Sequence, residues 1–148
     1  MKEKELMERK NNLPKAITGL LLSIVVLFMV SCSFSTANIS SADLAKEVPG
    51  GKPEKISGTT FHTADGPFHL LVIVANAPEG TKVKASWFAV EAGNEKGTLI
   101  DENEITLTNE TDVDFNLSLP RPWPVGKYKV DLYLNSKLDR TIPFDVKE

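Results

Sequence analysis

The stretch TDVDFNLSLP, residues 111–120, alternates polar and apolar side chains with a period of two. Its apolar members are Val113, Phe115, Leu117 and Leu119. Successive side chains of a β-strand point to opposite faces, so this stretch predicts a strand with one buried face and one wet face. Residues 127–135 repeat the pattern, with Tyr128, Val130, Leu132 and Leu134 on the inward side. These two segments point to an antiparallel β-protein.

The chain beyond residue 127 reads as a closing hairpin. Asn135 and Ser136 follow the second alternating strand, and residues of this kind are typical of tight turns. A last strand then contains Ile142, Phe144 and Val146. Proline cannot donate a ladder hydrogen bond, so Pro143 places this strand at an edge or turns its proline toward solvent.

Earlier strands are read from apolar runs and turn signals. Residues 68–75 are nearly all apolar, which predicts a central strand covered on both faces. Val83, Ala85 and Trp87 share one face of a strand over 82–90. Short strands near 98–100 and 104–108 flank an acidic turn at 101–103, and a first strand falls near 56–62. We therefore expect an all-β fold, an immunoglobulin-like antiparallel sandwich of about seven strands.

Two aromatic residues support this fold. Trp87 is expected between the two sheets, and Tyr128 follows Pro124 and Gly126 as in a tyrosine corner. The stretch from residue 123 to 130, with Phe144-Asp145-Val146, resembles the closing hairpin of immunoglobulin-like and fibronectin-type-III-like domains in secreted bacterial proteins. The resemblance implies a fold and no particular activity.

The N-terminus has the layout of a secretory signal. Basic residues precede an uncharged apolar run at 16–31, which is too short for a typical membrane-spanning helix. The string Met29-Val30-Ser31-Cys32 resembles the lipobox of bacterial lipoproteins. That resemblance implies cleavage of residues 1–31, the signal helix, and lipidation of Cys32. An uncleaved membrane anchor and an incidental buried thiol are the alternatives.

The lipobox resemblance also implies a location. Fatty acyl chains of the palmitate type on Cys32 would hold the chain at a bacterial cell membrane or outer membrane, facing away from the cytoplasm. Residues 32–55 are rich in small polar residues, proline and glycine, which predicts a flexible tether. A short helix over 41–48 is the alternative for part of it. The globular domain is then expected to cover residues 56–148.

The net charge and the absence of catalytic motifs limit the classes of function that the sequence supports. The signal holds five of the 17 basic and three of the 20 acidic residues, which leaves 12 and 17 and a net charge of −5. An acidic domain is a poor ligand for nucleic acid. No nucleophile–base set, phosphate loop or metalloprotease signature is visible, so we expect neither enzymatic activity nor a cofactor.

A binding surface is the remaining candidate. If 82–90 and 127–135 are neighbours, Lys84, Phe88, Lys129 and Tyr133 share an outward face that could recognise an envelope protein or glycan. Scattered surface aromatics are the simpler interpretation of the same residues. Trp123 is a further candidate for this surface, although it could instead pack beneath the loop before Tyr128.

Two other functions stay open from the sequence. His62, Asp65 and His69 could approach one another in a hairpin and bind a metal ion, although their spacing matches no structural zinc motif. The domain could also be a structural spacer in an envelope complex.

Overall fold

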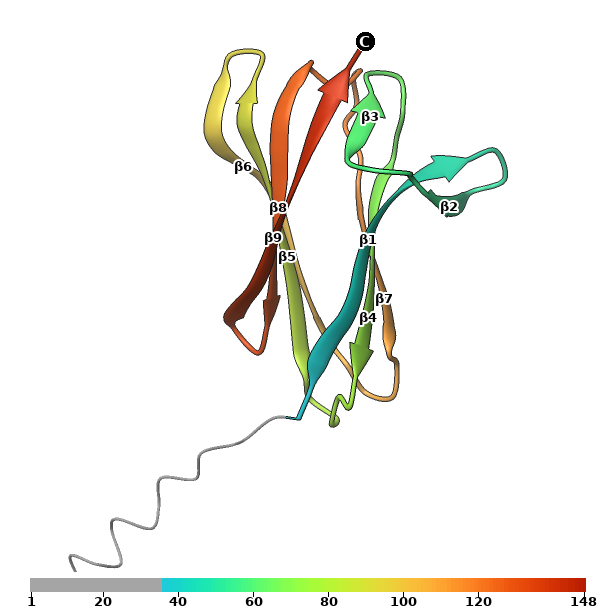
Figure 1. Ribbon diagram of the computed structural model, residues 1–148, viewed down its shortest axis with the longest axis vertical. Coiled ribbons are helices and arrows are strands. Elements are labelled where there is room, and N and C mark those ends of the chain that lie inside the picture. The colour runs from blue at the N-terminus through green and yellow to red at the C-terminus, as the bar shows by residue number, and fades with distance from the viewer. Residues whose placement is uncertain (1–35) are drawn as a thin grey trace, which may run out of the picture. The chain divides into compact units, whose positions relative to one another are not determined.

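The computed structural model describes residues 36–148, which fold into nine β-strands (Figure 1). In chain order they are β1 (Asn38–Val48), β2 (Lys52–Lys55), β3 (Thr60–His62), β4 (Phe68–Ala75), β5 (Lys82–Ala92), β6 (Glu95–Thr106), β7 (Asp112–Leu117), β8 (Gly126–Leu134) and β9 (Lys137–Lys147). Across residues 36–148 no helix is long and apolar enough to cross a membrane.

The strands form two sheets. One has the order β2-β1-β4-β7 and the other β3-β9-β8-β5-β6. All pairings are antiparallel except that of β3 with β9. With β1, β4 and β7 in one sheet and β5, β8 and β9 in the other, the order matches strands A, B, E and C, F, G of an immunoglobulin sandwich. The predicted all-β, immunoglobulin-like fold is confirmed, with nine strands rather than seven.

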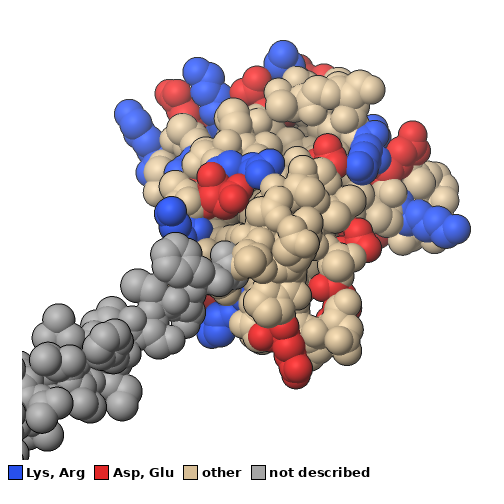
Figure 2. All heavy atoms as spheres, turned by 60° about the horizontal axis from the view of Figure 1, so that its bottom comes forward, with Lys and Arg blue, Asp and Glu red and all other residues tan. Residues whose placement is uncertain are grey.

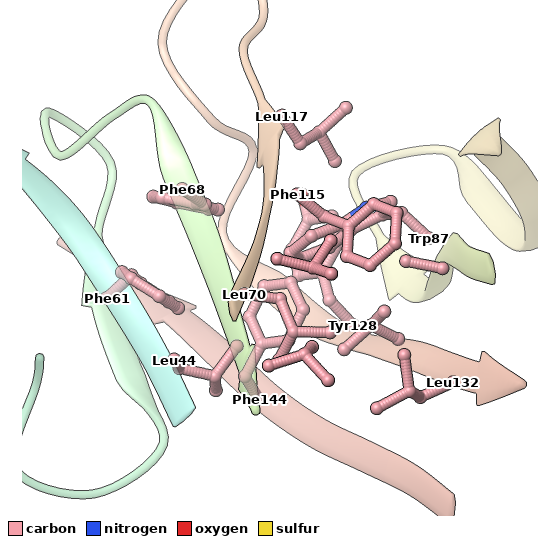
Figure 3. Close-up of a cluster of buried hydrophobic side chains, with 14 of the residues drawn as sticks. Leu44, Phe61, Phe68, Leu70, Trp87, Phe115, Leu117, Tyr128, Leu132 and Phe144 are labelled. Atoms are coloured by element: carbon pink, nitrogen blue, oxygen red, sulfur yellow. The ribbon is translucent and has the colours of Figure 1, made fainter. Parts of the chain in front are cut away.

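The core lies between the two sheets and contains a set of contacting aromatic rings among aliphatic side chains (Figure 3). Trp87 is 1% exposed and meets Phe144 edge to face, with ring centroids 6.0 Å apart. Phe144 also stacks on Tyr128 at 5.4 Å and meets Phe61 at the same distance. The prediction that Trp87 lies between the sheets is therefore correct.

The predicted flexible tether over 32–55 is wrong for its described part. Residues 38–55 form β1 and β2, and β1 pairs with β4 along most of its length. Ile39, Leu44 and Ala45 are buried, so this segment contributes to the core. Residues 41–48 are strand and not helix. The predicted domain boundary at residue 56 is therefore too late.

Two further expectations need correction. The short strands near 98–100 and 104–108 are one strand, β6, and the predicted acidic turn lies inside it: Asp101 and Glu102 pair with Trp87 and Ser86. A register shift opposite Trp87 and Phe88 lets the strand continue. The strand predicted at 56–62 is shorter in the structure, where it is β3 (Thr60–His62). It is also not the first strand, because β1 and β2 precede it.

The central strand β4 and the final strand β9 behave partly as expected. Ile73 is 40% exposed, so the outer face of β4 is covered only in part, whereas its inner face packs on the core. Pro143 pairs with Lys129 of β8, whereas β3 pairs only with residues from Asp145 onward. Pro143 therefore lies where β9 has a neighbour on one side only, as a residue without an N–H requires.

Candidate functional site

The candidate surface is built by the register between β5 and β8. Lys84 lies opposite Tyr133, and Phe88 lies opposite Lys129. The Nζ of Lys84 is 4.5 Å from the ring centroid of Tyr133, and the Nζ of Lys129 is 4.7 Å from that of Phe88. Each lysine therefore covers the ring on the neighbouring strand. We call these four residues the aromatic face, and the structure brings them together as the sequence predicted.

A row of polar residues runs between the two cation–ring pairs. Ser86 lies opposite Asp131, and both are buried, at 1% and 6% exposure. The hydroxyl of Ser86 donates to Glu102 at 2.6 Å, and the hydroxyl of Thr141 donates to Asp131 at 2.6 Å. The first bond joins β5 to β6 and the second joins β9 to β8, while Ser86 and Asp131 lie opposite each other in the ladder between β5 and β8.

The lysines of the aromatic face are also neutralised within it. Lys84 lies 3.2 Å from a carboxylate oxygen of Glu102, and Lys129 lies 2.6 Å from one of Asp131. The hydrogen bond from Ser86, followed by that from Lys84, holds the pKa of Glu102 below its usual value. The surface thus presents paired charges and half-buried rings, without an unpaired lysine.

Two exposed leucines extend the aromatic face, and the sequence analysis missed both. Leu99 of β6 lies opposite Phe88 and is 50% exposed, while Leu138 of β9 lies opposite Tyr133 and is 49% exposed. Apolar groups therefore reach across four strands. Leu99 could have been assigned to this face only from the register between β6 and β5. The sequence predicted two short strands in place of β6 and so gave no such register.

Trp123 does not belong to the aromatic face. It is 3% exposed, stacks on Phe68 with centroids 4.1 Å apart, and meets Tyr128 edge to face at 5.6 Å. Trp123 instead packs beneath the loop before Tyr128, as the alternative interpretation had it. That loop is tied down because the Tyr128 hydroxyl donates to the carbonyl oxygen of Pro124 at 2.7 Å. Burial raises the pKa of Tyr128, and nearby Arg121 partly offsets this.

The residues proposed as metal ligands are engaged elsewhere. The Nδ1 of His62 lies 3.0 Å from the main-chain oxygen of Glu148. Asp65 accepts hydrogen bonds from the Lys46 ammonium at 3.0 Å and from the His62 backbone N–H at 2.8 Å. Hydrogen bonding from His62 and Lys46 outweighs burial and lowers the pKa of this carboxyl.

The third proposed ligand, His69, lies on β4 and uses its Nδ1 to meet the carboxylate of Asp114 at 2.9 Å. Its Nε2 is buried and has no hydrogen-bond partner. Between residues 36 and 148, no group of three or more His, Cys, Asp or Glu side chains is arranged to hold a metal ion. The hypothesis of a His62–Asp65–His69 metal site is therefore not supported by the geometry.

An open hollow of about 310 Å³ lies at one end of the sandwich. Residues 63–67 form one wall, and residues 118, 119 and 121–123 form the other, which includes the exposed Arg121. Cys32, the predicted lipidation site, lies outside the described residues.

Comparison with known proteins supports the fold. No family model matches the chain, and no curated protein matches it. Among solved structures, a crystal structure of an immunoglobulin-like protein from Pseudomonas aeruginosa is similar, with a TM-score of 0.53 and 12% sequence identity. The match covers 75% of this chain and 96% of that one. At this identity the likeness shows an immunoglobulin-like fold and nothing of function.

Proposed function

We propose that this chain is an exported lipoprotein, anchored through Cys32, whose sandwich binds another protein of the cell envelope through the aromatic face. The signal-like sequence before Cys32 supports the anchor. An immunoglobulin-like fold and the absence of a recognisable catalytic motif in the sequence support a binding role rather than an enzymatic one.

The observation that carries the binding role is the ordered pair of cation–ring contacts between β5 and β8. Phe88 and Tyr133 are half-buried before any partner arrives, so little side-chain entropy is lost on binding. Leu99 and Leu138 add exposed apolar area on either side. Aromatic residues surrounded by satisfied polar groups are typical of the centre of protein interfaces.

The chemistry of this surface favours a protein over a glycan. The carboxylates of Glu102 and Asp131 already accept bonds from neighbouring side chains, so they are poorly placed to meet sugar hydroxyls. The leucines at both margins favour a partner with an apolar patch of its own.

The anchor is tested by mass spectrometry of the N-terminal peptide from membrane fractions. We expect a peptide that begins at Cys32 and carries acyl chains, and we expect Cys32→Ser to abolish both cleavage and membrane retention. An unmodified full-length chain in the cytoplasm would contradict the anchor.

The face is tested with the double variant Phe88→Ala/Tyr133→Ala in the full, anchored chain. In-cell crosslinking should recover a protein adduct from the parent chain and lose it from this variant. The matched control, Leu71→Ala/Ile73→Ala, removes apolar groups from the outer face of the other sheet, on β4, and should retain the adduct. Equal recovery from both variants, with folded domains by circular dichroism, would exclude the aromatic face, and a carbohydrate adduct would exclude a protein partner.

A further inference from the structure

We propose that the open hollow between residues 63–67 and the loop before β8 is a binding site for a carboxylate, held by the Arg121 guanidinium and the indole N–H of Trp123. The hollow measures about 310 Å³, and both residues line it. None of the four residues of the aromatic face lines it, so this site is independent of that face and of the anchor at Cys32.

The indole nitrogen of Trp123 is a hydrogen-bond donor without an acceptor. The side chain is 3% exposed, and within residues 36–148 its Nε1 forms no hydrogen bond. A Cβ added to Gly66, which also lines the hollow, would be 3.3 Å from this nitrogen, so the glycine leaves room beside it. A donor that lacks an acceptor on a nearly buried side chain costs free energy, and an oxyanion in the hollow would recover that cost.

Arg121 supplies an uncompensated positive charge at the same hollow. On the face drawn in Figure 2, basic and acidic side chains lie next to one another at several places. Arg121 has no such neighbour: it is exposed, and it forms no ion pair with any residue in the described range 36–148.

The acidic residues of the two hollows that Arg121 lines are engaged with other groups. Asp65 is the only acidic residue among those lining the proposed site, and it accepts a hydrogen bond from the Lys46 ammonium at 3.0 Å. In the second hollow the carboxylate of Glu95 accepts a hydrogen bond from the Thr98 hydroxyl at 2.8 Å. Since Lys46 balances Asp65, the proposed site retains the single positive charge of Arg121.

Both walls of the hollow are held in place before a ligand arrives. The backbone N–H of Trp123 donates to the carbonyl oxygen of Thr63 at 3.1 Å, which joins the two walls. The Trp123 ring stacks on that of Phe68 with centroids 4.1 Å apart. Prolines at 120, 122 and 124 restrict the backbone of the same loop. A ligand therefore does not have to order this loop, which lowers the cost of binding.

The lining favours a carboxylate over other anions. A planar guanidinium presents paired N–H donors that match the two oxygens of a carboxylate. One positive charge balances one carboxylate, whereas a phosphate group carries more than one negative charge at neutral pH. Pro67, Leu119 and Pro122 also line the hollow and offer apolar contacts to the group that bears the carboxylate. Ligand pockets measure about 300–1,000 Å³, so this one fits a small acid or the carboxyl-terminal residue of a polypeptide.

The chain has two tryptophans, so their indole N–H resonances give a direct test. The full chain in detergent micelles, isotope-labelled at its tryptophan nitrogens, is titrated with propionate, with N-acetyl-alanyl-alanine and with the C-terminal amide of that dipeptide. We expect an acid to give a saturable shift of the Trp123 resonance, and the amide to bind at least about tenfold more weakly. The resonance of Trp87, which is 1% exposed between the sheets, should not move and reports an intact fold.

A pair of variants isolates the arginine. Arg121→Gln should weaken binding of the acid about tenfold or more, because it removes the charge. Lys127→Gln is the matched control: it removes one positive charge at an exposed position that does not line the hollow, and it should leave the affinity unchanged.

The three probes also distinguish the sources of the carboxylate. A response to propionate supports the site with a small free acid as its ligand, and a response to the dipeptide acid alone supports it with a chain terminus. The absence of a saturable shift with either acid overturns the site. A shift that the amide or Arg121→Gln reproduces at equal affinity overturns it as well.

Discussion

The hydroxyl of Tyr128 donates a 2.7 Å hydrogen bond to the carbonyl oxygen of Pro124, four residues before it. This bond closes the loop before β8 over Trp123, whose ring packs on that of Tyr128. The tyrosine corner inferred from sequence is therefore present, and it fixes the first residues of the strand that carries Lys129 and Tyr133.

Tyr128→Phe should lower the free energy of unfolding by about 1 kcal/mol, because it removes a hydrogen bond while keeping the ring in place. For a domain of this size the loss corresponds to a fall in Tm of about 4–8 °C. Thermal unfolding of the 36–148 fragment measures it. Tyr133→Phe is the control, since Tyr133 is partly exposed on the opposite face of the same strand, and should change the unfolding free energy by less than about 0.5 kcal/mol.

A second prediction concerns Gly126, where the backbone of β8 leaves no room for a side chain beside β5. A Cβ at this position would clash with the carbonyl oxygen of Glu91 and with the Cα of Ala92. Gly126→Ala should therefore force the two strands apart and cost about 3 kcal/mol or more. Chemical denaturation measures the loss.

The control for Gly126 is Gly97→Ala, in the exposed strand β6. Its φ of 64° is also unfavourable for alanine, but no atom lies within 4 Å of the added Cβ. It should cost only about 1–2 kcal/mol from the backbone conformation. Equal losses in the two variants would show that the close approach at Gly126 is relaxed at little cost.

Sequence patterns predicted the strands that have one wet face and one dry face. β7 alternates without interruption, β8 alternates except at the buried Asp131, and Trp87 and Tyr128 lie where an immunoglobulin-like sandwich requires them. β6 was broken in two because it is an edge strand exposed on both faces, so no alternation marks it. The register between β6 and β5 places Leu99 beside Phe88. This pairing could not be predicted without knowing that register.

The sequence did not predict the strand β1, for a different reason. Its two large core residues, Ile39 and Leu44, are five positions apart, which fits neither strand nor helix periodicity. A register shift between Ile39 and Ser41 brings both residues to the core side.

The contact between His69 and Asp114 could not be predicted from the sequence either, because it joins residues 45 positions apart on neighbouring strands.

The role of β1 gives a third prediction. Leu44 is 5% exposed, and Leu44→Ala should cost about 2–5 kcal/mol by leaving a cavity between the sheets. Glu47→Ala, at an exposed position of the same strand, should be nearly neutral. Urea denaturation of the 36–148 fragment compares them. A flexible tether would tolerate both substitutions equally, so equal midpoints would contradict the placement of β1 in the core.

The last prediction concerns pH and the loop between β6 and β7. The carboxylate of Glu110 accepts hydrogen bonds from the Thr108 hydroxyl at 2.8 Å, from the Thr108 N–H at 3.1 Å and from the Asn109 N–H at 3.2 Å. The Thr108 hydroxyl, followed by these backbone donors, lowers the pKa of Glu110 from 4.5 to about 2. The charged carboxylate therefore favours the folded chain.

Because the folded pKa lies below the unfolded one, the stability from Glu110 is complete above pH 4.5 and is lost as the pH falls toward about 2. Glu110→Gln, which resembles the protonated acid, should lower the urea midpoint at pH 7, and the gap from the parent chain should close between pH 4.5 and 2. Glu79→Gln, in the neighbouring loop, is the control for removing one negative charge and should show no such convergence. A gap for Glu110→Gln that stays constant across this range would mean that the loop does not depend on the ionised carboxylate.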